Sequence, residues 1–180
     1  LTLTNSLNYQ FDIADLHNFE ILALAEDQNV DSESVNASSQ NAITDDVEEL
    51  SLNQAGLTSA SSEYRRVGFL GRVNYNFDQK YLLAGSFRRD ASTRFGANNR
   101  WGNFWSVAAG WNIAKESFME DSNINNLKLR GSWGTTGNDQ IGNYRYASTL
   151  VTRFIYPIGG AAVQGTTAEG LPNPNLKWEE

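Results

Sequence analysis

The chain has 180 residues, is 40% hydrophobic and carries a formal net charge of −7. It contains no cysteine and one histidine, which excludes a disulfide scaffold, a cysteine–zinc site and a thiol nucleophile. Its apolar runs fall far short of the roughly 20 residues of a membrane-spanning helix. Acidic residues outnumber basic ones, 21 to 14, which argues against a nucleic-acid-binding protein.

Six stretches of the chain alternate apolar and polar residues with a period of two, which is the signature of β-strands. The apolar residues almost always carry odd numbers, as in Val67, Phe69 and Val73, although Leu22 and Leu24 of the second stretch are exceptions. Because successive side chains of a strand point to opposite faces, one face of the sheet is expected to be apolar and the other polar. Such a sheet is either half of a soluble sandwich or the wall of a membrane barrel. The expected strands span approximately 1–11, 17–27, 63–77, 80–91, 103–114 and 126–135.

The connections between these strands alternate between short and long. The short ones are 12–15, 78–80 and 115–125, the last with room for one helical turn; the long ones are 29–62, 92–102 and 136–175. In an antiparallel up-and-down meander, alternate connections lie at the same end of the sheet. Outer-membrane barrels combine short periplasmic turns with long extracellular loops, so the three long connections are predicted to be extracellular.

One short helix is expected inside the first long connection. Asp45 and Glu48 are spaced as in a capping box, which predicts a helix over 46–52.

Odd-numbered aromatic residues gather near the two ends of the predicted strands. Trp105 and Trp133 lie nearer the long connections. Membrane barrels carry aromatic belts at both interfaces, whereas a sandwich would bury the same rings in its core. Those near the short turns are Tyr9, Phe11, Tyr75, Phe77, Tyr81 and Trp111.

Charged side chains at even positions belong to the polar face, which would line the lumen of a barrel. Such side chains can contact a substrate, or they can pair across neighbouring strands, which is the interpretation we favour. Arg89 is odd and is expected to extend outward to the upper interface. The candidates on the lumen side are Arg66, Arg72, Arg88, Asp90 and Arg130.

Enzyme chemistry has little support in the sequence. His17 lies near Asp15 and Glu20, but no motif marks a serine that could complete a catalytic triad. No metal-ligand spacing or phosphate-binding loop is present either. We therefore predict no catalytic residue, no metal site and no cofactor.

A resemblance to one known family rests on five segments of the chain. These segments are 71–83, 89–102, 106–111, 126–138 and 173–179. In this order and with plausible spacing, they resemble the SusC/RagA-type TonB-linked outer-membrane proteins of Bacteroidota.

The resemblance implies a barrel of about 22 strands around an N-terminal plug, located in the bacterial outer membrane and in contact with its lipid. It further implies TonB-energised uptake of glycans or peptides, with a SusD-type surface lipoprotein as partner. Strand patterns are already under way at Leu1 and begin again at Leu176, so we expect residues 1–180 to be an internal piece of about six strands, without plug or TonB box. Taken alone, such a piece should be an open, curved sheet.

The alternative class is a soluble or cell-surface sandwich that binds carbohydrate or protein. A barrel enzyme is a weaker third hypothesis. A sandwich should bury its apolar face in a core, whereas a barrel wall should leave that face uncovered.

Overall fold

The computed structural model describes residues 1–39 and 54–179. Its main feature is a six-stranded sheet in the order β1–β2–β3–β4–β5–β6. Each strand pairs antiparallel with the next along the chain, so the all-β up-and-down meander is confirmed. The strands are β1 (Thr2–Ile13), β2 (His17–Ser39), β3 (Gln54–Phe77), β4 (Tyr81–Ser92), β5 (Trp101–Asn112) and β6 (Lys128–Gly134).

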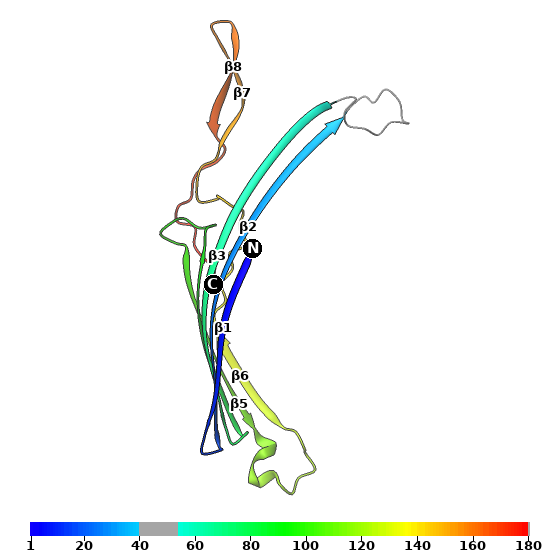
Figure 1. Cartoon of the computed structure of the whole chain (residues 1–180), viewed down its shortest axis with the longest axis vertical. Coiled ribbons are helices and arrows are strands. Elements are labelled where there is room, and N and C mark those ends of the chain that lie inside the picture. Colours follow the sequence, from blue (N-terminus) through cyan, green and yellow to red (C-terminus); the bar gives the residue numbers. More distant parts are fainter. Residues whose placement is uncertain (40–53, 180) are drawn as a thin grey trace, which may run out of the picture.

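The sheet is open and curved, with β1 and β6 at its edges (Figure 1). Within the described residues, no helix is both long and apolar enough to cross a membrane.

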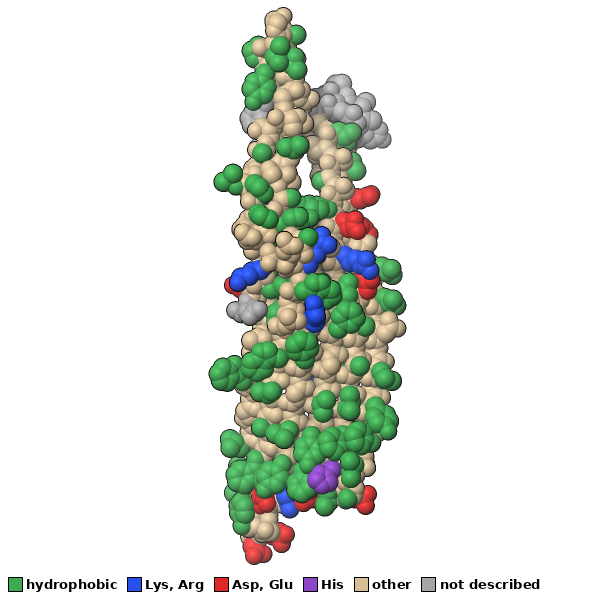
Figure 2. Space-filling view, turned by 90° about the vertical axis from the view of Figure 1, so that its left-hand side faces the viewer, with side chains coloured by type: hydrophobic (Ala, Val, Ile, Leu, Met, Phe, Trp, Pro, Cys, Tyr) green, Lys and Arg blue, Asp and Glu red, His purple; other side chains and the backbone are tan. Residues whose placement is uncertain are grey.

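The register pairs odd residues with odd residues throughout the sheet except beyond Ser38, where it shifts, so the odd residues share one face. One row across the sheet comprises Tyr9, Ile21, Val73, Gly85, Val107 and Trp133. Large apolar side chains of this face stand exposed, Val107 by 53% and Trp133 by 76%. Figure 2 shows them spread over the convex face of the sheet.

No core covers this apolar face. Among the described residues only two hydrophobic side chains are buried, Phe95 and Phe104, and both belong to the end of the sheet where the long connections lie. A sandwich would bury the odd-numbered side chains of all six strands, so the sandwich alternative is not supported.

The short connections form tight turns. Ala14 and Asp15 both have positive φ, as do Asp78 and Gln79, and two successive positive φ angles are typical of the type I′ turns that fit the twist of a hairpin. The third short connection, between β5 and β6, was predicted to hold one helical turn. It contains two 3₁₀ turns, η2 (Ile113–Lys115) and η3 (Ser117–Met119).

The first long connection was predicted wrongly over most of its length. β2 continues to Ser39 and β3 begins at Gln54, with paired residues from Asn29↔Arg65 to Ser38↔Gly56. This extension is polar on both faces and therefore lacks the alternation that identified the other strands. The helix predicted over 46–52 lies outside the described residues.

The third long connection contains a hairpin of its own, β7 (Leu150–Ile158) and β8 (Ala161–Ala168), which was not predicted. Gly159 and Gly160 form its turn, with φ of 61° and 83°. Glycine adopts this left-handed conformation without steric cost. The hairpin projects beyond the end of the six-stranded sheet (Figure 1).

Candidate functional site: the two faces of the sheet and its rim

Aromatic rings form a continuous belt on the convex face at the turn end, which is the end of the sheet where the short turns lie. Phe19 lies between Phe11 and Tyr75, with ring centroids 4.9 and 4.8 Å away. His17 belongs to the same belt: its Nδ1 lies 2.8 Å from the Tyr75 hydroxyl, and its ring lies 4.8 Å from that of Phe77. The predicted belt is present, and its contacts give His17 a packing role.

Two further belt residues share one carboxylate. The Trp111 indole N–H and the Tyr81 hydroxyl donate to Glu116 Oε1 at 2.8 and 2.7 Å. Glu116 lies in the connection between β5 and β6, outside the strands. The hydrogen bond from Trp111, followed by that from Tyr81, lowers the pKa of Glu116. This arrangement anchors the polar edges of both rings at the end of the sheet.

Toward the long connections, which lie at the top of Figure 2, the apolar band ends in a row of charged side chains. Arg65 forms an exposed ion pair with Asp27 of β2. Arg89 is on the convex face, as predicted, and its guanidinium lies 4.8 Å from the centre of the Trp101 ring. An apolar band between an aromatic belt and a charged row has the profile of a membrane-facing surface.

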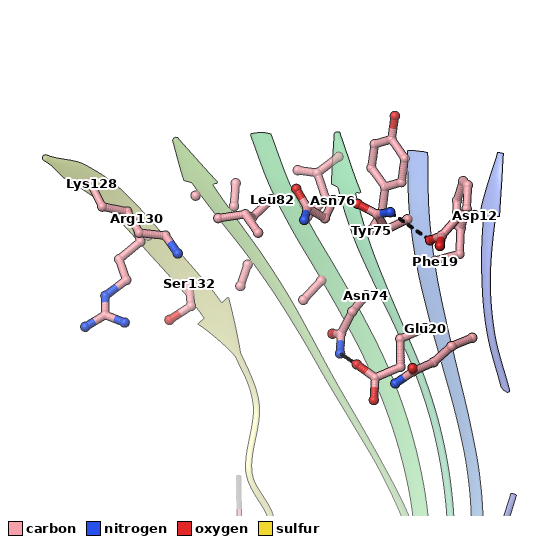
Figure 3. Close-up of a pocket in the computed structure, with 18 residues that line it drawn as sticks. Asp12, Phe19, Glu20, Asn74, Tyr75, Asn76, Leu82, Lys128, Arg130 and Ser132 are labelled. Atoms are coloured by element: carbon pink, nitrogen blue, oxygen red, sulfur yellow. Dashed lines mark hydrogen bonds between the residues drawn. The ribbon is translucent and has the colours of Figure 1, made fainter. Parts of the chain in front are cut away.

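The opposite, concave face is polar and forms a hollow of about 920 Å³ near the turn end (Figure 3). On one side of this lower hollow, Asp12 accepts a hydrogen bond from Asn18 at 2.7 Å and Glu20 accepts one from Asn74 at 2.9 Å. On the other side, β6 contributes Lys128 and Arg130. The floor of the hollow is therefore acidic on β1 and β2 and basic on β6.

A second hollow of about 430 Å³ lies on the same face, nearer the rim, which is the end of the sheet where the long connections lie. Arg88 and Asp90 line it as an ion pair with N–O distances of 2.9 and 2.7 Å. Arg66 also lines it and makes a two-pronged contact with Asp139, whose exposed fraction is only 5%. A bidentate arginine–carboxylate pair is strong and fixes geometry, so Asp139 holds its segment against the sheet.

Arg94 completes this attachment from the loop after β4. It donates to the Asp139 carbonyl at 3.1 Å and to the Asn143 side chain at 3.0 Å. Its guanidinium lies 4.0 Å from the Tyr64 ring centre, and that of Arg66 lies 5.5 Å from it. Two arginines therefore lie close to the ring of one tyrosine at the rim.

An aromatic cluster holds three separate segments together at the rim. The Trp178 ring lies 5.2 Å from Phe95 and 5.3 Å from Phe104, and its N–H donates to the Arg100 carbonyl at 2.9 Å. Asn138 and Glu179 pair as an isolated antiparallel bridge. These contacts join segments 89–102, 126–138 and 173–179, three of the five on which the family resemblance rests.

The five candidate residues all lie on the concave face. Arg66, Arg88 and Asp90 line the upper hollow and Arg130 lines the lower one. Arg72 lies between them, beside Leu22 and Ser86.

The pairing expected across strands was wrong. Arg88 binds Asp90 two positions along its own strand, and Arg66 binds Asp139 in the segment after β6. Within the described ranges, Arg72 and Arg130 form no ion pair.

Several site residues were missed by sequence reasoning. Asp12, Glu20 and Lys128 occupy even positions, so the rule that selected Arg72 would also have selected them. Asp139 carries no such signal, because it lies outside any strand and is 73 positions from Arg66.

Comparison with known proteins identifies the family. The family model described as "TonB dependent receptor-like, beta-barrel" matches residues 1–180. The chain belongs to the TonB-dependent receptor family. TonB-dependent receptor P3 of Formosa agariphila is 35% identical over 168 residues, which cover 91% of this chain and 17% of that protein. TonB-dependent receptor SusC of Bacteroides thetaiotaomicron is 38% identical over 128 residues, or 68% of this chain and 13% of that protein.

Among solved structures of this family, the RagAB peptide transporter matches with a TM-score of 0.85 at 31% identity, over 98% of this chain and 20% of that chain. The same importer in its "open-open" state matches equally well, at 30% identity and 0.85. The chain thus spans a fifth or less of the length of these TonB-dependent receptors.

Proposed function

We propose that the protein containing this chain imports a glycan or a peptide across the bacterial outer membrane, and that this chain forms part of the barrel wall. The observation that carries the proposal is the convex apolar band, bounded by the aromatic belt and the charged row and backed by a polar concave face. The similarity to SusC and to the RagAB peptide transporter supports the same activity.

In this proposal the tight turns face the periplasm, and the connections at 29–62, 92–102 and 136–175 face outward. A SusD-type lipoprotein binds from outside, and TonB acts through a plug region that lies outside residues 1–180. Transport is passage through the lumen without covalent chemistry or cofactor. Arg72 and Arg130 are the candidates for substrate contact, because neither has an ion-pair partner among the described residues.

The test is uptake by cells that lack the gene and are complemented with the intact protein. Labelled neutral oligosaccharides and labelled peptides are supplied separately, and restored uptake of one class identifies the cargo. Arg72→Ala combined with Arg130→Ala should slow this uptake, whereas Arg65→Ala, on the convex face, should not. Complementation that restores uptake of neither class would contradict the proposed transport. If the double variant takes up the cargo as fast as the Arg65→Ala variant, Arg72 and Arg130 do not contribute to substrate contact.

A further inference from the structure

Within the described part of the chain, the upper part of β3 has a neighbouring strand on one side only. Its residues pair with β2 from Val30↔Tyr64 to Ser38↔Gly56. On the other side β4 ends at Ser92, opposite Arg66. The last contacts with the chain that follows β4 join Arg65 and Thr93, after which that chain turns away.

The pattern of hydrogen bonds shows which backbone groups face this open side. Arg65 directs both its N–H and its carbonyl to Thr93, at 2.9 and 3.0 Å. Alternate residues of an antiparallel strand point the same way, and two positions along, the Glu63 N–H donates to the Tyr144 hydroxyl at 3.0 Å. The next residues in the series are Ser61, Ser59 and Leu57, whose backbone groups have no partner on this side among the described residues.

This edge lacks the features that protect exposed strands. Natural edge strands carry lysine, proline, bulges or inward charges that prevent a further strand from adding. Residues 54–62 contain no charge and no proline, and the register with β2 is regular over 56–64. Figure 2 shows the paired upper parts of β2 and β3 and the β7–β8 hairpin rising separately, with open space between them. An extended segment therefore has both room and a row of free backbone groups.

The charges around the edge indicate which segment would fit. Asp31 of β2 lies directly opposite Glu63 of β3, and Glu33 of β2 lies opposite Ser61 of β3. Opposed like charges destabilise a strand pair unless a counter-charge is supplied. Arg65, two positions from Glu63 on the same face, is already paired with Asp27, and residues 1–64 contain no lysine or arginine.

We propose that the open edge of β3, Leu57–Ser61, binds an extended basic segment of a partner protein as an additional strand. The backbone groups of Leu57, Ser59 and Ser61 supply the hydrogen bonds of the new ladder. The carboxylates of Asp31, Glu33 and Glu63 form ion pairs with lysine or arginine side chains of the incoming strand. This interaction is separate from the passage of cargo through the lumen.

The experiment measures binding of a labelled, acetylated peptide of alternating lysine and valine to the intact protein in lipid nanodiscs. Ser59→Pro removes an N–H that faces the open side, so the ladder with β2 is preserved and only the edge is blocked. It should weaken binding about tenfold or more, whereas the matched Ser59→Thr, which keeps the N–H, should bind normally. The same peptide N-methylated at alternate residues should lose affinity, and Asp31→Asn with Glu63→Gln should reduce both affinity and its dependence on salt.

The proposal is overturned if the peptide does not bind, or if the N-methylated peptide or the Ser59→Pro protein binds as tightly as its parent. A dimer that Ser59→Pro converts to a monomer would show that the edge pairs with a second copy, and would also overturn it. Circular dichroism of the Ser59→Pro protein separates edge blocking from misfolding.

Discussion

Gly68 lies opposite Asp90 on the neighbouring strand, and the Asp90 carboxylate occupies the space that a side chain at position 68 would need. A methyl group there would also approach the Arg88 guanidinium, at 3.1 Å. The absence of a side chain at one position of β3 therefore permits the ion pair on β4.

Gly68→Ala is accordingly expected to destabilise the intact protein by about 1–3 kcal/mol, because the Arg88–Asp90 pair must move. Gly71→Ala is the matched control, since a methyl group at Gly71 meets nothing within 4 Å. Urea unfolding in detergent measures both. Equal destabilisation by the two substitutions would show that loss of glycine, and not displacement of Asp90, is responsible.

Val107 and Ala108 are neighbours on β5 that point to opposite faces. Val107 is 53% exposed on the convex face, and Ala108 lines the lower hollow. A spin label at 107 in the lipid-reconstituted protein should be relaxed by a lipid-soluble agent, whereas a label at 108 should not. Equal protection of the label at 107 from lipid-soluble and water-soluble agents would place it in a protein core.

Asp139→Ala should release the segment after β6 from the rim. The substitution leaves half-buried Arg66 without its carboxylate, and we expect a loss of about 1–3 kcal/mol together with faster hydrogen exchange over 138–143. Asp27→Ala removes the partner of Arg65 in an exposed pair, where a loss below about 1 kcal/mol is expected. If the two variants behaved alike, the burial of Asp139 would have no energetic consequence.

Acid should loosen the contacts of Glu116. Its folded-state pKa lies below the ordinary value, so its hydrogen bonds stabilise the folded state above the ordinary pKa, and this stabilisation is lost as the pH falls through the folded-state pKa. Fluorescence of Trp111, isolated by replacing the other tryptophans, should therefore change at pH values below the ordinary glutamate pKa. Glu116→Gln should abolish this transition, and a transition that persists in this variant would have to come from another group.

The sequence predicts most of the sheet because one physical condition acts on all six strands. A strand with lipid-like surroundings on one side and polar surroundings on the other must alternate, and the constant odd parity follows from the register. Above the charged row both faces of a strand meet water. Segments such as 30–39 then have no apolar face, and only their pairing, set by the strands below, keeps them extended.

The remaining features depend on contacts that a single sequence does not reveal. Even parity places Arg66 and Arg88 on the correct face, but their partners are decided by loop geometry at the rim. The β7–β8 hairpin did carry a signal, since Gly159-Gly160 between apolar stretches is a hairpin turn pattern. It was overlooked within a region rich in glycine and asparagine.

The bridge between Asn138 and Glu179 brings together two points that are 41 residues apart along the chain. Most of the chain between them leaves the rim and returns to the same place, as a closed excursion with a fixed base. The entropic penalty of such an excursion grows only slowly with its length. Residues 146–172 can thus change in length or sequence while the wall below remains unchanged, which makes this stretch the natural place for surface variation.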